Sequence, residues 1–176
     1  MNTKDICKNF KKNGFVVLRN FLSKPQLKKI FFQLNQLIDV PLESINTSSK
    51  KNLTLDEKYL LLKEKNPKLK SRFYETITYL DSINSISNSK KITNIVKNIL
   101  KEKTVFVGSS QIRVDHSKDP YYLPQHQELG QMSTKLVLFY MPLINLNKKT
   151  GGLYIRPKTH ELGFVPFKGH NKEGKA

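Results

Sequence analysis

The stretch that decides the expected fold starts at residues 124–128, PQHQE, and continues through residues 136–141, LVLFYM, to residues 150–160, TGGLYIRPKTH. The LVLFYM run has no polar alternation, which predicts a strand buried on both faces or a central strand covered by helices, within a longer strand over residues 134–143. Three further segments share its β-branched and aromatic character: residues 104–107, 112–114 and 153–155. Gly, Pro, Asn and Asp separate these segments, so the second part of the chain is expected to form a mainly antiparallel sheet.

The part that precedes these segments has helical character. Ser23 is a good N-cap, Pro25 fits a first turn, and the apolar residues that follow recur at helical spacing. Helices are expected over residues 5–12, 24–38, 54–62, 67–80 and 87–101, and a short strand over residues 15–18, FVVL. The predicted fold class is α+β, with a helical N-terminal part packed on a sheet. One domain is expected over residues 1–176, mostly helical over 1–102, mostly β over 103–168, and a loose tail over 169–176.

The composition is strongly basic. Lys and Arg number 31 against 14 Asp and Glu, a formal charge of +17. Nearly all of the bases are Lys, and Arg, the preferred reader of nucleic-acid bases, occurs only at positions 19, 72, 113 and 156. A solvated basic surface is therefore expected, with no nucleic-acid partner. An attraction for anionic substrates is compatible with a solvated basic surface and with a nucleic-acid-binding surface alike.

Cysteine usage and hydropathy bear on the compartment. Cys7 is the only cysteine, so no internal disulfide can form. The first twelve residues carry charges throughout, and the longest apolar run, residues 136–143, is too short to span a bilayer. These features predict a cytoplasmic protein with no membrane span; they leave its oligomeric state open.

His126 and Glu128 form the candidate metal site. In extended backbone, residues two apart point to the same side, so the imidazole and the carboxylate are able to converge on one ion. They would supply two members of the 2-His-1-carboxylate set that binds non-haem iron. The competing interpretation is an ordinary surface or core histidine. The sequence has no phosphate-binding glycine loop, zincin motif or paired cysteine ligands.

Three motifs in order carry a family resemblance: residues 13–23, NGFVVLRNFLS, then residues 124–128 and residues 150–160. Together they resemble the phytanoyl-CoA dioxygenase family of Fe(II)- and 2-oxoglutarate-dependent oxygenases. The resemblance implies a double-stranded β-helix, or jelly roll, that hydroxylates a small organic substrate. It implies that His126 and Glu128 are metal ligands, with Glu128 where the family usually has Asp, and that Gln127 lies near the 2-oxoglutarate site.

The resemblance also sets limits on the site. His160 matches a family histidine that is not the distal iron ligand, and Lys158 replaces the glycine that this segment usually has two residues earlier. The distal iron histidine and the 2-oxoglutarate arginine have no match, and His170 is the only histidine after His160. A C-terminally truncated family member that lacks its last strands is therefore expected. Two alternatives stay open: a non-catalytic small-molecule-binding module on the same scaffold, and a nucleic-acid-binding protein favoured only by the charge.

Overall fold

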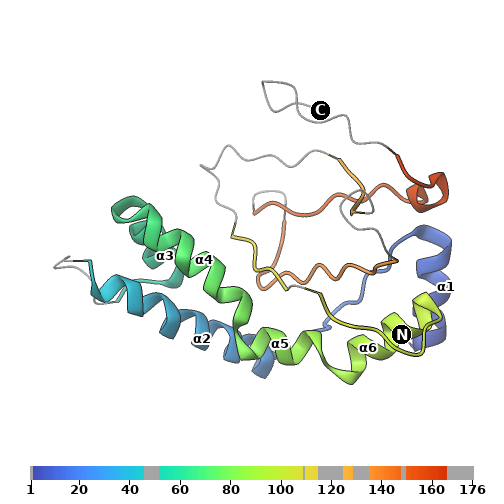
Figure 1. The fold of residues 1–176 in the computed structure, drawn as a ribbon, viewed down its shortest axis with the longest axis horizontal. Coiled ribbons are helices and arrows are strands. Elements are labelled where there is room, and N and C mark those ends of the chain that lie inside the picture. The colour runs from blue at the N-terminus through green and yellow to red at the C-terminus, as the bar shows by residue number, and fades with distance from the viewer. Residues whose placement is uncertain are drawn as a thin grey trace. The chain divides into compact units, whose positions relative to one another are not determined.

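The computed structural model describes residues 2–45, 52–108, 110–114, 125–128, 135–147 and 150–165 (Figure 1). By compactness the chain divides into two units. The first, which we call the helical unit, consists of residues 20–92 and 106–113. The second, which we call the motif unit, consists of residues 1–19, 93–105 and 114–176 and carries the 124–128 and 150–160 motifs.

The helical unit is built around one long helix. Its elements are α2 (Lys24–Glu43), α3 (Leu55–Lys65), α4 (Pro67–Thr76), η1 (Ile77–Tyr79), α5 (Asp81–Ser87) and the first turn of α6 (Lys90–Leu100). α2 begins at a capping box in which Ser23 accepts from the Gln26 backbone N–H and Gln26 accepts from that of Ser23. Its buried residues recur every fourth position: Ile30, Leu34, Ile38 and Leu42. That stripe is the face on which α3, α4 and α5 pack.

A single residue separates α3 from α4. Asn66 ends α3, and its side-chain oxygen accepts from the Leu69 N–H at 3.0 Å to begin α4. Pro67, at the start of α4, fits a first turn because its missing N–H would have no helical partner there. The two helices bury Tyr59, Leu62 and Phe73. Each such side chain, fully buried, contributes about 1.5–3 kcal/mol.

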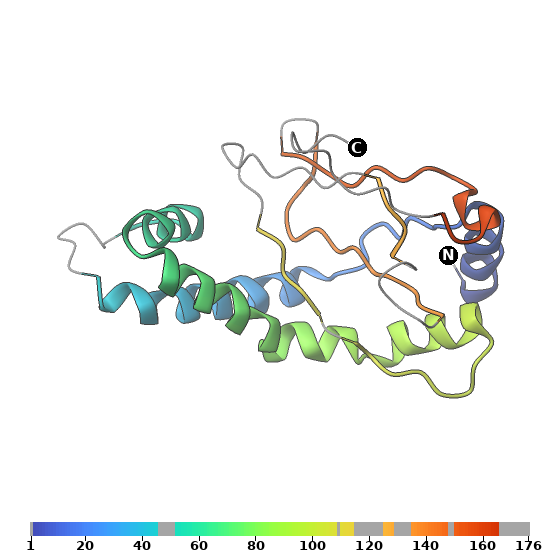
Figure 2. The ribbon, with the colours of Figure 1, turned by 45° about the horizontal axis from the view of Figure 1, so that its top comes forward.

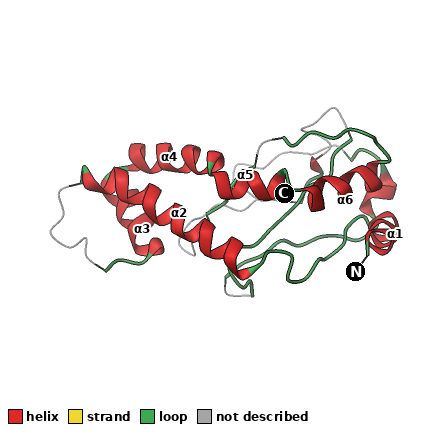
Figure 3. Cartoon of the chain, turned by 90° about the horizontal axis from the view of Figure 1, so that it is seen from below, coloured by secondary structure: helices red, strands yellow, loops and turns green. Residues whose placement is uncertain are grey.

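The motif unit contains α1 (Thr3–Asn13), the rest of α6 and the short helix η3 (Thr159–Leu162). The Asn2 side chain caps α1 by accepting from the Asp5 N–H at 2.9 Å. Gly14 ends this helix at φ 82°, a left-handed conformation that favours glycine. Ile6 of α1 and Ile95 of α6 are buried. The remaining described residues of this unit run as loops and turns between the helices (Figure 3).

The helix predictions are confirmed at each of the five positions, with ends displaced by a few residues. The helix expected over residues 67–80 divides into α4 and η1, and α5 was not predicted. None of the described helices is both long and apolar enough to cross a membrane.

The predicted α+β fold class is wrong. The part of the chain that the structure describes is 56% helix and contains no β-strand, so it has no sheet, double-stranded β-helix or jelly roll. The expected strands at 15–18, 104–107, 112–114 and 153–155, and residues 135–143 of the longest one, are loops. Residue 134 and the expected tail, 169–176, lie outside the described residues. A β-rich composition gives a strand only when another segment supplies the ladder hydrogen bonds, and no described segment does so here.

The LVLFYM run also departs from the expected burial. Leu138 and Tyr140 are exposed, whereas Leu136, Val137, Phe139 and Met141 are half-buried. From Val137 to Met141 the exposure alternates with the period of extended backbone, in which neighbouring side chains point to opposite sides. No residue of the run is fully buried, so the expected burial on both faces is not observed.

Candidate functional site

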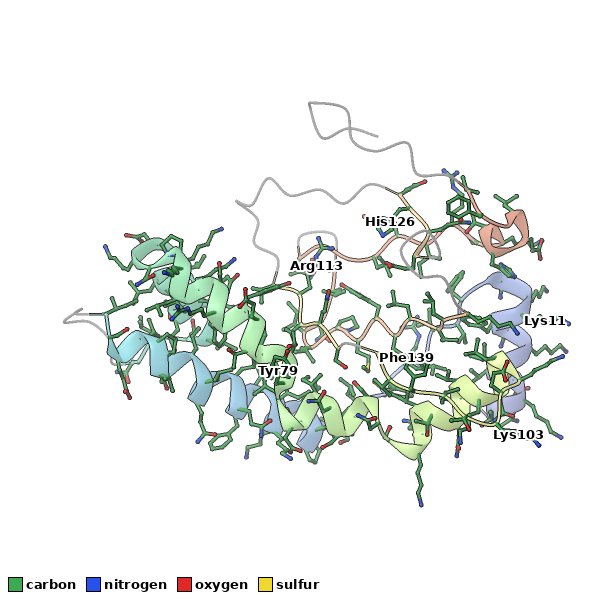
Figure 4. The ribbon with its side chains drawn as sticks, in the orientation of Figure 1. Lys11, Tyr79, Lys103, Arg113, His126 and Phe139 are labelled. Atoms are coloured by element: carbon green, nitrogen blue, oxygen red, sulfur yellow. The ribbon has the colours of Figure 1, made fainter. Side chains whose placement is uncertain are left out.

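His126 and Glu128 lie together in the motif unit. His126 Nε2 is 3.3 Å from Glu128 Oε1, so the two side chains turn to the same side of the backbone. The His126 side chain is 16% exposed and that of Glu128 is 40% exposed. The imidazole is thus largely enclosed, while the carboxylate is open to solvent (His126 is labelled in Figure 4).

The distance between these two atoms fits a shared ion as well as a direct hydrogen bond. Imidazole nitrogen and carboxylate oxygen bind a first-row metal at about 2.1 Å, which places two neighbouring ligand atoms about 3.0–3.4 Å apart. The observed 3.3 Å lies in this range. A metal would therefore need little movement of either side chain to bind both atoms.

No third ligand joins the pair within the described parts of the chain, where no group of three or more His, Cys, Asp or Glu side chains could hold a metal. His116 and His170 lie outside the described residues. The described donor set therefore consists of one nitrogen and one oxygen ligand.

Gln127, between the two candidate ligands, has a different set of partners. Its Nε2 donates to the Gly163 carbonyl oxygen at 3.0 Å and to that of Thr159 at 3.4 Å. Its Oε1 accepts from the Val165 N–H at 2.8 Å. Both ends of the amide therefore bind the backbone around η3. These bonds hold the 125–128 and 159–165 segments together, a role that sequence reasoning did not assign to Gln127.

His160 lies at the end of α1 and not beside His126. Its Nε2 is 2.9 Å from the Lys11 carbonyl oxygen, which is one of the last carbonyls of that helix. Because a carbonyl only accepts, this hydrogen bond requires a proton on Nε2. The last carbonyls of a helix have no partner within the helix, and His160, which is distant in sequence, supplies a donor to the Lys11 carbonyl.

Two of the sequence motifs meet at this point. The Lys158 N–H donates to the Asn13 carbonyl oxygen at 2.9 Å, and the His160 ring lies over Gly14. A Cβ atom on Gly14 would lie only 2.5 Å from His160 Nδ1, so the close approach requires glycine. The beginning of the 13–23 motif and the end of the 150–160 motif are thus in contact (Figures 1 and 2). Nothing in the sequence indicated this contact, because Gly14 and His160 lie far apart along the chain.

A scan against models of known protein families, a search of curated proteins and a search of solved structures each found no match. The resemblance to phytanoyl-CoA dioxygenases stays a prediction.

Proposed function

We propose that the chain is a non-haem Fe(II)- and 2-oxoglutarate-dependent oxygenase of the phytanoyl-CoA dioxygenase type, in which His126 and Glu128 bind the metal. The carrying observation is the 3.3 Å separation of His126 Nε2 and Glu128 Oε1. It supports metal binding because the two donor atoms lie on the same side of the backbone at the separation of neighbouring metal ligands. The oxygenase chemistry rests on the motif resemblance, and the substrate is a small organic molecule.

The residues of the pair would have separate tasks. When bound, Fe(II) with 2-oxoglutarate would supply the activation of O2 for hydroxylation of a C–H bond. His126 would provide a neutral nitrogen ligand from a largely enclosed ring, and Glu128 would provide a negative charge that offsets that of the metal. Gln127 would position both, because its bonds to residues 159–165 hold the backbone between them.

A second candidate function is a non-catalytic binding module that takes a small molecule or a metal without turnover. The arrangement of Gln127 favours it. Both ends of its amide already bind backbone groups, so cosubstrate binding at this residue would require those bonds to break. The two protein ligands found among the described residues would also leave most of the metal coordination to water, which predicts weak affinity.

Anaerobic calorimetry with Mn(II) as a stand-in for Fe(II), followed by 2-oxoglutarate, tests metal binding. We expect Mn(II) to bind, and we expect H126A to weaken this binding at least tenfold because it removes one of the two candidate ligands that the described residues supply. E128A should weaken it similarly, and E128D should restore part of the loss. H160Q is the matched control, since it changes a histidine of the same unit whose ring belongs to η3 and bonds to the end of α1.

Turnover separates the two candidate functions. An oxygenase should release succinate from 2-oxoglutarate in the presence of Fe(II) and O2, even without its substrate, and H126A should abolish this release. Metal binding without succinate release would favour the binding module. Equal Mn(II) affinity in the wild type and H126A would reject the assignment of the site.

A further inference from the structure

The segment that contains η3 exposes an unusual amount of apolar surface. Every residue from 151 to 165 except Thr159 is exposed. Tyr154 is 87% exposed, Leu162 67% and Phe164 58%. Large apolar side chains in one short segment are costly to leave in water, and such patches mark sites of interaction.

Cations accompany these apolar side chains. Arg156 and Lys158 lie in the same segment and are exposed. On α1, the exposed lysines at positions 4, 8, 11 and 12 follow helical spacing and fall on one side of the helix. Ile6, the buried residue of α1, lies on the opposite side. The acidic residues among them are Asp5 and Glu161, so positive charge predominates.

Hydrogen bonds place the two elements next to each other. The Lys158 N–H bonds to Asn13 and His160 bonds to Lys11, which fixes η3 at the C-terminal end of α1 (Figures 1 and 2). Gln127 also bonds to the backbone of Gly163 and Val165, directly after η3. We call Lys4, Lys8, Lys11, Lys12 and residues 153–165 the α1–η3 surface. Its backbone is bonded in place, although its apolar side chains are uncovered.

We propose that the α1–η3 surface binds the face of an anionic lipid bilayer. Basic residues next to exposed aromatic and aliphatic side chains suit this partner, because lipid phosphates and carboxylates attract the cations while the apolar groups enter the boundary of the acyl chains. Tyr154 has the amphipathic ring that favours such a boundary. The interaction is peripheral and independent of the proposed oxygenase activity.

Charge and side-chain type favour a bilayer over other partners. A second copy placed on this surface about a two-fold axis would bring Lys11 and Lys12 close to the same lysines of its partner, which is unfavourable. A nucleic acid would use the cations and the tyrosine, but it offers nothing to exposed aliphatic groups such as Leu162 and Val165. A bilayer uses both kinds of side chain.

Co-sedimentation of the full chain with phosphatidylcholine vesicles, with and without phosphatidylserine, tests the proposal. We expect binding to the anionic vesicles only, and we expect high salt to weaken it. K11Q/K12Q should reduce the partition coefficient about thirtyfold, at the ~1 kcal/mol that each basic residue contributes near such a surface. L162S/F164S should reduce it at least tenfold, since both side chains leave water on binding. These four positions are exposed, so the variants are expected to fold.

K24Q/K28Q is the matched control, because it removes two exposed lysines of α2 from the helical unit. It should leave the partition coefficient nearly unchanged. Equal binding to neutral and anionic vesicles, or no binding to either, would overturn the proposal. The proposal would also be overturned if K24Q/K28Q lowered the partition coefficient as much as K11Q/K12Q does, because the vesicles would then attract the total charge of the protein. Sedimentation equilibrium without vesicles completes the test: a dimer that L162S/F164S dissociates would assign the surface to a second copy.

Discussion

The helical unit and the motif unit differ in where they place their apolar side chains. Among the described residues, ten of the twelve buried apolar side chains belong to the helical unit, and only Ile6 and Ile95 belong to the motif unit. The exposed large apolar side chains have the opposite distribution, with ten of fifteen in the motif unit. The helical unit therefore has an apolar core of its own, whereas the described segments of the motif unit bury few apolar side chains and are joined by hydrogen bonds.

The comparison shows how the two kinds of apolar pattern differ. A stripe at every third or fourth residue becomes a face as soon as the helix forms, and a neighbouring helix covers it. An apolar extended segment cannot satisfy its own backbone hydrogen bonds. Its backbone groups and its side chains both need a partner from elsewhere in the chain. The motif unit brings its segments together through Gln127, Lys158 and His160 instead.

The largest expected effect comes from a truncation in the core of the helical unit. Ile38 is fully buried on α2, so I38A should lower the free energy of unfolding by about 2–5 kcal/mol through lost burial and a cavity. Leu138 is 62% exposed in the motif unit, and L138A should change the free energy of unfolding by less than about 0.5 kcal/mol. Urea unfolding followed by far-ultraviolet circular dichroism measures both. A loss in L138A comparable to that in I38A would show that residues 135–147 also pack in a core.

A smaller effect is expected at the contact between α1 and η3. Gly14 has φ 82° and Gly151 has φ 81°, so alanine should cost about 1–2 kcal/mol of left-handed strain at either position. Only G14A also places a Cβ against His160, since nothing lies within 4 Å of a Cβ at Gly151. G14A should therefore destabilise the molecule more than G151A does.

Amide hydrogen exchange at Lys158, whose N–H bonds to Asn13, gives the local measurement. G14A should accelerate this exchange, and G151A should not. In G14A/H160A the steric part of the loss should disappear because the ring is gone. If G14A and G151A behave alike, the His160 ring does not rest on Gly14 in solution.

The sequence was informative where its signals are local. Ser23 and Pro67 marked the starts of α2 and α4, and the sequence offered Thr54 or Asp56 as the cap of α3, of which Thr54 is the one observed. A capping side chain or a proline acts within its own turn, which is why these signals are readable in the sequence. α5 was missed because it has no side-chain cap. It is tied to α2 by Lys29, 2.6 Å from Asp81, and by Gln33, 3.1 Å from the Ser82 N–H, contacts between residues far apart in sequence.

For the candidate site, the sequence indicated the His126 and Glu128 pair because a spacing of two is a local property. It could not show that the Gln127 amide binds residues 159–165, since that depends on how two distant segments meet. The sheet was predicted from β propensity, which mostly reflects packing against neighbouring strands and thus carries little information about pairing.

The smallest expected effect is the response of the two capping boxes of the helical unit to a fall in pH. At the start of α3, the Glu57 carboxylate accepts from the Thr54 backbone N–H at 2.7 Å and from its hydroxyl at 2.8 Å. Both bonds lower the pKa of Glu57 below its ordinary value of 4.5, and the bond from the Thr54 backbone has the larger effect. Because the folded pKa is depressed, this stabilisation is fully present above about pH 4.5 and is lost as the pH falls through the folded value. The Thr54 amide resonance should therefore shift in that acidic range.

The box at the start of α2 supplies an internal control, because its acceptor is the Gln26 amide, 2.8 Å from the Ser23 N–H, and does not titrate. The Ser23 amide resonance should stay unchanged while that of Thr54 moves. A local measurement is needed because Lys29 and then Ser85 also lower the pKa of Asp81, so global stability falls with acid for a second reason. E57Q should give α3 the same pH-independent cap as α2. A Thr54 titration that persists in E57Q would assign the acid response to another carboxylate.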